Sequence, residues 1–288
     1  MSPHSFHLIG RKLFVYNYSM TKFKIAAVQM SSGPDKEKNL KRAEKLITIA
    51  VKKGVKFIAL PEVFNYRGNL NKAVNEAERI PGYSTNFISK LAKKYKAWIL
   101  IGSILETVEA GRDLPFNTSV LINPQGKIVA KYRKMHLFDI KLKGKEILES
   151  SRNQAGTSPK LVSLAGIKTG LSICYDLRFP ELYRHYSSKG SQIICIPSSF
   201  TKITGEAHWH TLIKARAVEN LCYVIAPNQA GTGSGGVKTY GHSLIVDPWG
   251  KILAEGPANG EAVIITEIDL DYLKRIRQNL PVLEHRKL

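Results

Sequence analysis

Residues 166–198, GIKTGLSICYDLRFPELYRHYSSKGSQIICIPS, decide the fold class that this sequence predicts. Residues 166–175 are rich in apolar side chains and indicate a strand, and Pro180 starts a helical pattern that ends near Ser188. Residues 192–198 then return to a strand pattern. A strand, a helix and a second strand in close succession are typical of an α/β protein.

The same alternation continues on both sides of this segment. Two hairpins are predicted, at 117–133 around Asn-Pro-Gln-Gly and at 240–255 around Pro-Trp-Gly, while 136–159 is loop-rich. We therefore expect one α/β domain with inserted hairpins, in which a sheet face without helices needs a second sheet. The remaining predicted strands are 22–30, 56–61, 98–106, 222–227 and 262–268, and the remaining helices are 35–54, 84–96 and 206–221.

The composition is that of a globular protein. Of 288 residues, 43% are hydrophobic and 23% are charged, which excludes a disordered or collagen-like chain. No apolar run approaches the roughly 20 residues that a membrane span needs, so we expect no membrane association. Residues 1–20 contain no acidic side chain, and we expect a poorly ordered extension there, with a transit peptide as the alternative. The domain is expected at 21–288.

The chain is strongly basic, with 43 Lys and Arg against 23 Asp and Glu, a net charge of +20. Basic patches attract nucleic acid, but these lysines are spread over predicted helix faces, without zinc-finger spacing or an RNA-binding motif. We expect a basic surface that attracts small anionic molecules, and no nucleic-acid partner. Three cysteines are too few for a disulfide framework or a zinc site, and they fit a reducing cytoplasm.

Cys174 is the candidate nucleophile among the three cysteines. It ends a predicted strand and is followed by polar residues, whereas Cys195 and Cys222 lie in apolar strands typical of inert thiols. The carboxyl end of a strand faces the usual ligand crevice of an α/β sheet. A thiol nucleophile needs a base, and the sequence leaves several open: the strand-end carboxylate of Glu62, or the histidines His136, His185, His208, His210 and His242.

Three further patterns must be judged by the sequence around them. Lys134 ends the first hairpin, where a lysine in a pocket can stabilise a tetrahedral oxyanion, although any one lysine of so many is usually solvated. Residues 231–236, GTGSGG, match G-x-G-x-x-G, but a strand pattern follows instead of a helix, which indicates a flexible loop near the active site. His208 and His210 point to different faces of a helix, so no metal pair is expected.

Three islands of sequence resemble the signature of the nitrilase (carbon–nitrogen hydrolase) superfamily. They are LPEVF at 60–64, YRKMHLFD at 132–139 and ICYDLRFPE at 173–181, and the resemblance extends from Lys22 to Leu288. The fold that this resemblance implies is an α-β-β-α sandwich, usually dimerising into a four-layered assembly. We therefore expect a homodimer or a higher homo-oligomer.

The resemblance also implies catalytic roles. The family's glutamate base matches Glu62, its lysine matches Lys134 and its cysteine nucleophile matches Cys174. A second glutamate, which assists the lysine, matches Glu149, and Glu146 is the alternative. The implied reaction is acyl transfer through a thioester.

Other groups are implied around these positions. The backbone N–H of Tyr175 would share the oxyanion with the lysine. No metal or organic cofactor is required. The candidate substrate-binding residues are Phe64, Arg178, Ser199, Phe200 and Thr201.

Later segments resemble one branch of the superfamily in particular, the amidases. Residues 197–210, 214–220 and 240–250 are similar to the amidase branch, and RQNLPVLEHR at 277–286 resembles the deaminated glutathione amidases. The implied function is a cysteine-dependent amidohydrolase that releases ammonia from a small carboxylate-bearing amide, with deaminated glutathione first and 2-oxoglutaramate, the ω-amidase substrate, as the alternative. Hydrolysis of a nitrile or an N-carbamoyl amine, and nucleic-acid binding on a degenerate hydrolase scaffold, remain open.

Overall fold

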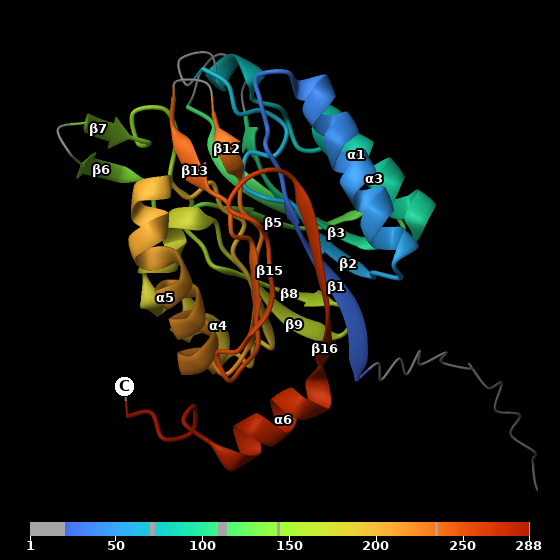
Figure 1. Cartoon of the computed structure of the whole chain (residues 1–288), viewed down its shortest axis with the longest axis vertical. Helices are drawn as coiled ribbons and strands as arrows, with labels where there is room; N and C mark the ends of the chain where they lie inside the picture. The colour runs from blue at the N-terminus through green and yellow to red at the C-terminus, as the bar shows by residue number, and fades with distance from the viewer. Residues whose placement is uncertain (1–20, 70–72, 109–113, 143–144, 234–235, 288) are drawn as a thin grey trace, which may run out of the picture.

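The computed structural model describes residues 21–69, 73–108, 114–142, 145–233 and 236–287, so the extension predicted at 1–20 lies outside it. Within the described residues, two six-stranded sheets form the body of the domain (Figure 1). The first has the order β16 (Ala262–Asp269), β1 (Lys22–Gln29), β2 (Phe57–Ala59), β3 (Trp98–Glu106), β4 (Phe116–Ile122), β5 (Ile128–Arg133). The second has the order β15 (Ile252–Glu255), β14 (Leu244–Val246), β11 (Tyr223–Ala226), β10 (Ile193–Cys195), β9 (Ile167–Leu171), β8 (Lys160–Leu164).

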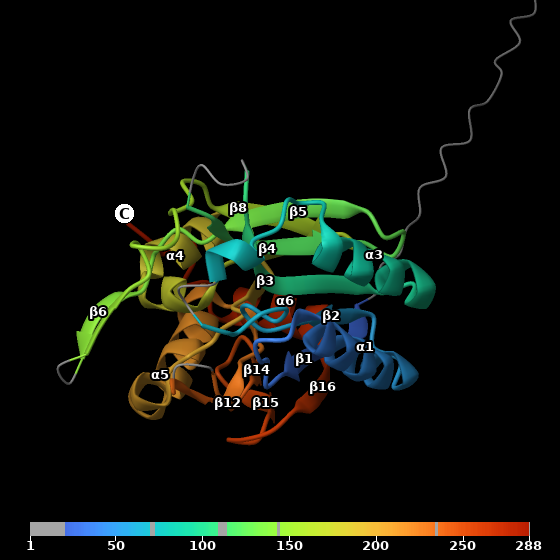
Figure 2. The ribbon, with the colours of Figure 1, turned by 90° about the horizontal axis from the view of Figure 1, so that it is seen from above.

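Helices cover the outer face of each sheet, as Figures 1 and 2 show from two directions. The helices α1 (Lys36–Lys52) and α3 (Tyr83–Tyr95) lie on the first sheet, and α4 (Pro180–Ser188) and α5 (Lys202–Asn220) lie on the second. The last helix, α6 (Leu270–Asn279), follows β16 directly. This is the α-β-β-α sandwich that the sequence predicted. No described helix has the length and apolar character needed to cross a bilayer.

Strand β1 contains a run of four buried apolar residues, 25–28. Neighbouring side chains of a strand point to opposite faces. Ile25 and Ala27 enter the core between the two sheets, and Ala26 and Val28 enter the core beneath α1 and α3. Both faces of the first sheet are therefore buried, which is the reason that a second sheet is needed.

The helix ends follow from local sequence. Asp35 caps α1, since its side chain accepts a hydrogen bond from the backbone N–H of Lys38 at 3.0 Å. Pro180 is the first residue of α4, where a missing N–H costs nothing. Thr201 caps α5, which begins at Lys202, four residues before the predicted start at 206.

Four expectations for secondary structure were incomplete. The stretch 136–159 contains a hairpin, β6 (Asp139–Leu142) and β7 (Lys145–Leu148), which projects from the body (Figures 1 and 2). The strand predicted over 166–175 ends at Leu171, because the chain turns into a short 3₁₀ helix, η2 (Cys174–Arg178). Residues 231 and 232, predicted as part of a loop, belong to β12 (Ala230–Thr232), which pairs with β13 (Lys238–Tyr240), and α6 was not predicted.

Candidate active site

Cys174 lies at a sharp turn between β9 and α4. Its φ is 48°, a left-handed conformation that costs a non-glycine residue about 1 kcal/mol or more. The turn is fixed because the backbone N–H of Cys174 donates to Pro197 O at 2.9 Å, just beyond β10. The next N–H, that of Tyr175, has no acceptor among the described residues. It is therefore free to donate to a substrate atom beside the sulfur.

Asp176 holds this turn against the segment that carries Lys134. Its buried carboxylate accepts hydrogen bonds from the N–H of Ile173 at 2.8 Å and from the hydroxyl of Tyr132 at 2.7 Å. It also accepts from the backbone N–H of His136 at 3.1 Å, and its Oδ1 lies 2.7 Å from the ring Nδ1 of His136. Sequence reasoning treated His136 as a possible base, but its ring pairs with Asp176.

Glu62 reaches the site from the end of β2. The chain after β2 packs so closely on β3 that a Cβ at Gly102 would lie 2.1 Å from Leu60 O. Only glycine fits there, and this close approach sets the position of Glu62. One carboxylate oxygen of Glu62 accepts from the backbone N–H of Ser199 at 2.7 Å, and the other lies 3.1 Å from Lys134 Nζ.

Lys134 lies between two carboxylates. Its ammonium group, which is buried, contacts Glu62 at 3.1 Å and Glu149 Oε2 at 2.8 Å. Glu149 Oε2 also accepts from the N–H of Phe138 at 2.7 Å. The alternative glutamate, Glu146, is exposed on β7. The geometry therefore favours Glu149 as the second acidic partner.

Asn117 is a site residue that the sequence analysis did not find. Its amide donates to Glu62 Oε1 at 2.9 Å and to Glu149 Oε1 at 3.4 Å, so that it links the two carboxylates. Its carbonyl oxygen is buried and has no hydrogen-bond partner among the described residues. The only signal was an amide at the start of a strand whose other residues are mostly apolar.

The charges of the site determine its protonation. Burial lowers the pKa of Lys134, but Glu149 and Glu62 outweigh it and raise the pKa well above its usual value. Burial raises the pKa of Glu149, but Lys134 outweighs it and the pKa is lowered. For Cys174, burial and the charge of Glu62 raise the pKa of the thiol well above 9.0, against the opposing effect of Lys134. The resting site therefore holds an ammonium, an ionised Glu149 and a neutral thiol.

These groups line a cavity of about 250 Å³. Three of the five predicted substrate-binding residues, Ser199, Phe200 and Thr201, are part of its wall. Phe64 is not, because it is fully buried in the core beneath α1 and α3. Arg178 lies behind the wall, with its guanidinium 5.8 Å from the ring of Tyr175 and 5.6 Å from that of Phe200.

Two cations in the cavity wall were not found from the sequence. Arg67 is buried and donates to Thr239 Oγ1 at 3.0 Å and to Ala230 O at 3.1 Å. Burial lowers its pKa to about 10, so it stays charged at neutral pH. Arg152 lies on the same wall, after β7. Among many basic residues, neither had a sequence signal of its own.

Comparison with known proteins agrees with this geometry. Residues 24–278 match the family model of the carbon-nitrogen hydrolases. The chain belongs to this family. It is 41% identical over 270 residues to the deaminated glutathione amidase of Synechocystis sp. (strain PCC 6803 / GT-S), covering 93% of this chain and 99% of that protein. It is 40% identical over 269 residues to the omega-amidase NIT2 of Xenopus tropicalis, with coverages of 93% and 96%.

The fold of this carbon-nitrogen hydrolase is similar to a solved structure. The crystal structure of Saccharomyces cerevisiae Nit3, a member of branch 10 of the nitrilase superfamily, gives a TM-score of 0.84 at 36% identity, covering 93% of this chain and 97% of that chain. The predictions of the nitrilase superfamily, of its sandwich fold and of a hydrolase acting on carbon–nitrogen bonds are therefore confirmed.

Among the described residues, the other cysteines and the histidines are not part of the cavity wall. Cys195 and Cys222 are buried, and burial raises the pKa of both thiols, that of Cys222 to about 12. His208 lies 3.3 Å from Arg178, whereas His210 lies 3.0 Å from Glu255, so the two histidines of α5 point in different directions as predicted.

Proposed function

We propose that this protein is a cysteine-dependent amidohydrolase whose nucleophile is Cys174. One observation carries the proposal: the ammonium group of Lys134 lies between Glu62 and Glu149 in the cavity that Cys174 lines. A neutral thiol beside an acceptor carboxylate and a fixed cation suits attack on a carbonyl, because the negative charge that forms is stabilised where it develops.

The proposed reaction has two steps. Glu62 accepts the proton of the thiol, the sulfur attacks the amide carbon, and Lys134 and the N–H of Tyr175 donate to the oxyanion. The tetrahedral intermediate collapses to a thioester as the carbon–nitrogen bond breaks, and the protonated Glu62 returns the proton to the leaving amine. Glu62 then takes a proton from water, and the water oxygen attacks the thioester carbon. The carbon–sulfur bond breaks to release the carboxylic acid, and Glu62 returns the proton to the sulfur, which restores the thiol.

Arg67 and Arg152 support a substrate with a carboxylate group. Both line the cavity of Cys174, and an arginine side chain is a cation at neutral pH. Arg67 already donates to Ala230, Val237 and Thr239, so it would add positive charge, whereas Arg152 would pair with an anionic end of the substrate through hydrogen bonds while the amide meets Cys174. The net charge of +20 also favours the approach of an anion.

We place deaminated glutathione first and 2-oxoglutaramate second, because relatives bearing the two activities are 41% and 40% identical to this chain. The two substrates differ in their leaving group. Glutathione contains only secondary amides, so its deaminated form would release an amine, cysteinylglycine. Only 2-oxoglutaramate, a primary amide, would release the ammonia that the sequence analysis expected.

The test measures both leaving groups. Purified protein is supplied with each substrate, and free amine and ammonia are followed for wild type and Cys174→Ala. We expect hydrolysis by wild type and a loss of at least about 10³-fold in the variant, with its fold unchanged by circular dichroism. Equal activity of the two proteins would exclude Cys174 as the nucleophile. A nitrile and an N-carbamoyl amine complete the panel.

The alternative of nucleic-acid binding has its own measurement. Binding to a DNA duplex would weaken steeply with added salt, because counterions are released on binding. We expect only weak binding without discrimination between sequences. Tight, salt-sensitive binding together with inactivity on every amide would favour the degenerate-hydrolase alternative.

We also propose a homodimer formed through α5. Val218 on α5 and Trp249 in the turn after β14 are 44% and 60% exposed, and Gly250 packs on Val218, so the two form one apolar patch. A second copy would bury it. Sedimentation should give a dimer for wild type and a monomer for Val218→Asp, and a monomeric wild type would exclude this interface.

The cytoplasm is the proposed location, because the three thiols are free and a reducing compartment would keep them so. Imaging of the full chain fused to a fluorescent protein at its C-terminus tests this, and an organelle pattern would contradict it.

A further inference from the structure

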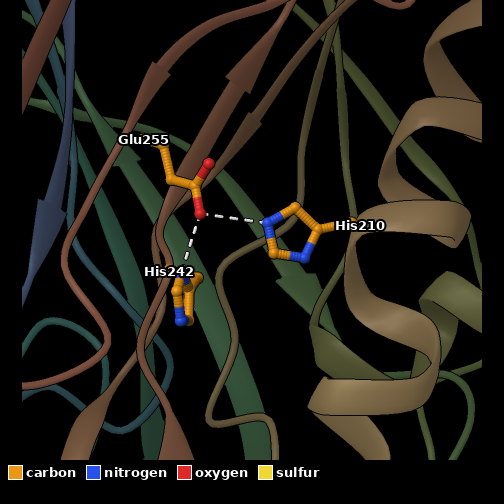
Figure 3. Close-up of side chains that lie close together, drawn as sticks. All are labelled: His210, His242 and Glu255. Atoms are coloured by element: carbon orange, nitrogen blue, oxygen red, sulfur yellow. Dashed lines mark hydrogen bonds and ion pairs between the residues drawn. The ribbon is translucent and has the colours of Figure 1, made fainter.

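Three side chains far apart in the sequence meet at the edge of the second sheet. His210 comes from α5, His242 from the connection between β13 and β14, and Glu255 from the end of β15. Glu255 Oε1 lies 3.0 Å from His210 Nε2 and 2.7 Å from His242 Nδ1. Figure 3 shows both imidazole rings directed at this one oxygen. None of the three lines the cavity of Cys174.

The surroundings hold this group in place. His242 has a φ of 49°, which a non-glycine residue keeps only where its neighbours determine it. Its N–H donates to Pro257 O at 3.1 Å, and its carbonyl accepts from the indole of Trp209 at 2.7 Å. The ring of Tyr240 lies 4.4 Å from that of His242. Hydrogen bonds therefore hold the backbone of His242, and the ring of Tyr240 packs beside its imidazole.

We propose that His210, His242 and Glu255 bind a divalent transition-metal ion of the Zn²⁺ class. Two imidazoles and one carboxylate form a donor set that Zn²⁺ prefers, with further positions left for water. The candidate ligand atoms all lie within 4.8 Å of one another. In a tetrahedral zinc site the donors are roughly 3.3 Å apart, so the separations of Glu255 from His210 and His242, 3.0 and 2.7 Å, need to widen by only about half an ångström or less.

The protonation of the group is compatible with coordination. A carboxylate oxygen only accepts hydrogen bonds, so the two imidazole nitrogens that face Glu255 are the donors. Without metal, the ring nitrogens that face Glu255 carry protons. On binding, each ring moves its proton to its other nitrogen, and the freed lone pair is donated to the ion without any redox change.

Partial exposure gives the ion access and water ligands. The side chains are 24–36% exposed, which suits a site open to solvent. A bound ion would join α5 to the β14–β15 hairpin. Trp209, beside His210, packs on Phe200 of the catalytic cavity with ring centroids 5.0 Å apart. We expect the ion to stabilise this part of the fold and to take no part in amide hydrolysis.

The test is a titration of tag-free, chelator-treated full-length protein with Zn²⁺ and with Co²⁺. Because the thiol of Cys174 is a competing ligand, the protein is first alkylated with iodoacetamide. We expect one equivalent of Zn²⁺ with Kd of about 10 µM or tighter. Co²⁺ should give visible absorption bands, and excess Zn²⁺ should raise Tm by roughly 5 °C.

Two variants and a control decide the outcome. Glu255→Gln keeps an acceptor for both histidines but removes the charge, and His210→Gln changes a surface position of α5. Each should weaken binding at least tenfold and reduce the Tm shift to about half or less, with circular dichroism unchanged. His208→Gln, on another face of the same helix, should bind like wild type. Unchanged affinity in both ligand variants, equal loss in the control, or Kd above about 1 mM for wild type would overturn the proposal.

Discussion

The hydroxyl of Tyr132 donates a 2.7 Å hydrogen bond to the buried carboxylate of Asp176, and this bond joins the segment of Lys134 to the turn of Cys174. The two segments belong to different sheets, so the distance between lysine and sulfur depends on this contact. Asp176 takes part in four hydrogen bonds, with the N–H of Ile173, the hydroxyl of Tyr132, and the backbone N–H and ring Nδ1 of His136. Its carboxylate is thus a fixed point of the site.

We expect Asp176→Asn to be strongly destabilising. An amide presents N–H groups to at least one donor, which leaves buried groups unpaired and costs about 2–4 kcal/mol. Tyr132→Phe removes a single hydroxyl and should cost about 1 kcal/mol. Urea unfolding of both variants measures the loss in the free energy of unfolding for each. Equal losses would show that the other hydrogen bonds of Asp176 contribute little to stability.

Replacing Glu62 should make the thiol of Cys174 easier to deprotonate and yet slow amide hydrolysis. Burial and the charge of Glu62 raise the pKa of Cys174, so the alkylation rate of wild type should keep rising above pH 9. In Glu62→Gln the negative charge beside the thiol is gone, so the pH profile of the alkylation rate should move to lower pH. The same variant lacks the proposed base, and amide hydrolysis should fall by about 10²- to 10⁴-fold. Iodoacetamide kinetics from pH 6 to 10 test the first part, and a profile that stays in place would contradict it.

Glu149→Gln should lower kcat by roughly ten- to a hundredfold with little effect on KM. The reason is that Lys134 loses one of its two carboxylates, at 2.8 Å, and is held less firmly at the oxyanion position. Glu146→Gln, on the exposed strand β7, is the matched control and should behave like wild type. Similar losses in the two variants would show that the hairpin as a whole, and not the contact with Lys134, matters.

Acid should destabilise the protein through Glu106. Its burial raises the pKa, but hydrogen bonds from Arg133 and Lys131, both at 2.8 Å, outweigh it and lower the pKa. The folded pKa therefore lies below the ordinary value of 4.5, so the stabilisation is present above about pH 4.5 and is lost as pH falls through the folded pKa. Glu106→Gln should lower Tm at pH 7, with a gap to wild type that closes in acid. Exposed Glu267→Gln is the control, and a gap independent of pH would refute the explanation.

Arg152→Gln tests the proposed carboxylate site. For an anionic amide we expect KM to rise about tenfold, a loss of ~1.4 kcal/mol, while kcat changes little. A neutral amide of similar size should be unaffected. Steady-state kinetics on the two substrates test this role. A loss of activity on both substrates would indicate general damage to the cavity instead of a lost contact with the carboxylate.

Local sequence predicted most of the sandwich because its elements have strong patterns of their own. The strand–helix–strand pattern of 166–198 holds, with Pro180 at the start of α4, because proline at the first helical position and a buried apolar strand are local signals. The hairpin β6–β7 was missed for the opposite reason. It stands outside both sheets, and its strands have only four residues each, so their alternation of polar and apolar side chains is brief.

The sequence by itself determined the alternation of strands and helices and, through the resemblance of its short motifs to a known family, the candidate nucleophile, base and lysine, because periodicity and short motifs are properties of neighbouring residues. Only the tertiary structure decided which groups touch. It selected Glu149 over Glu146, brought Asn117 between two carboxylates, tied Tyr132 to Asp176, and gathered His210, His242 and Glu255. Such contacts arise from packing two sheets against each other, which places side chains within hydrogen-bond distance irrespective of their separation along the chain.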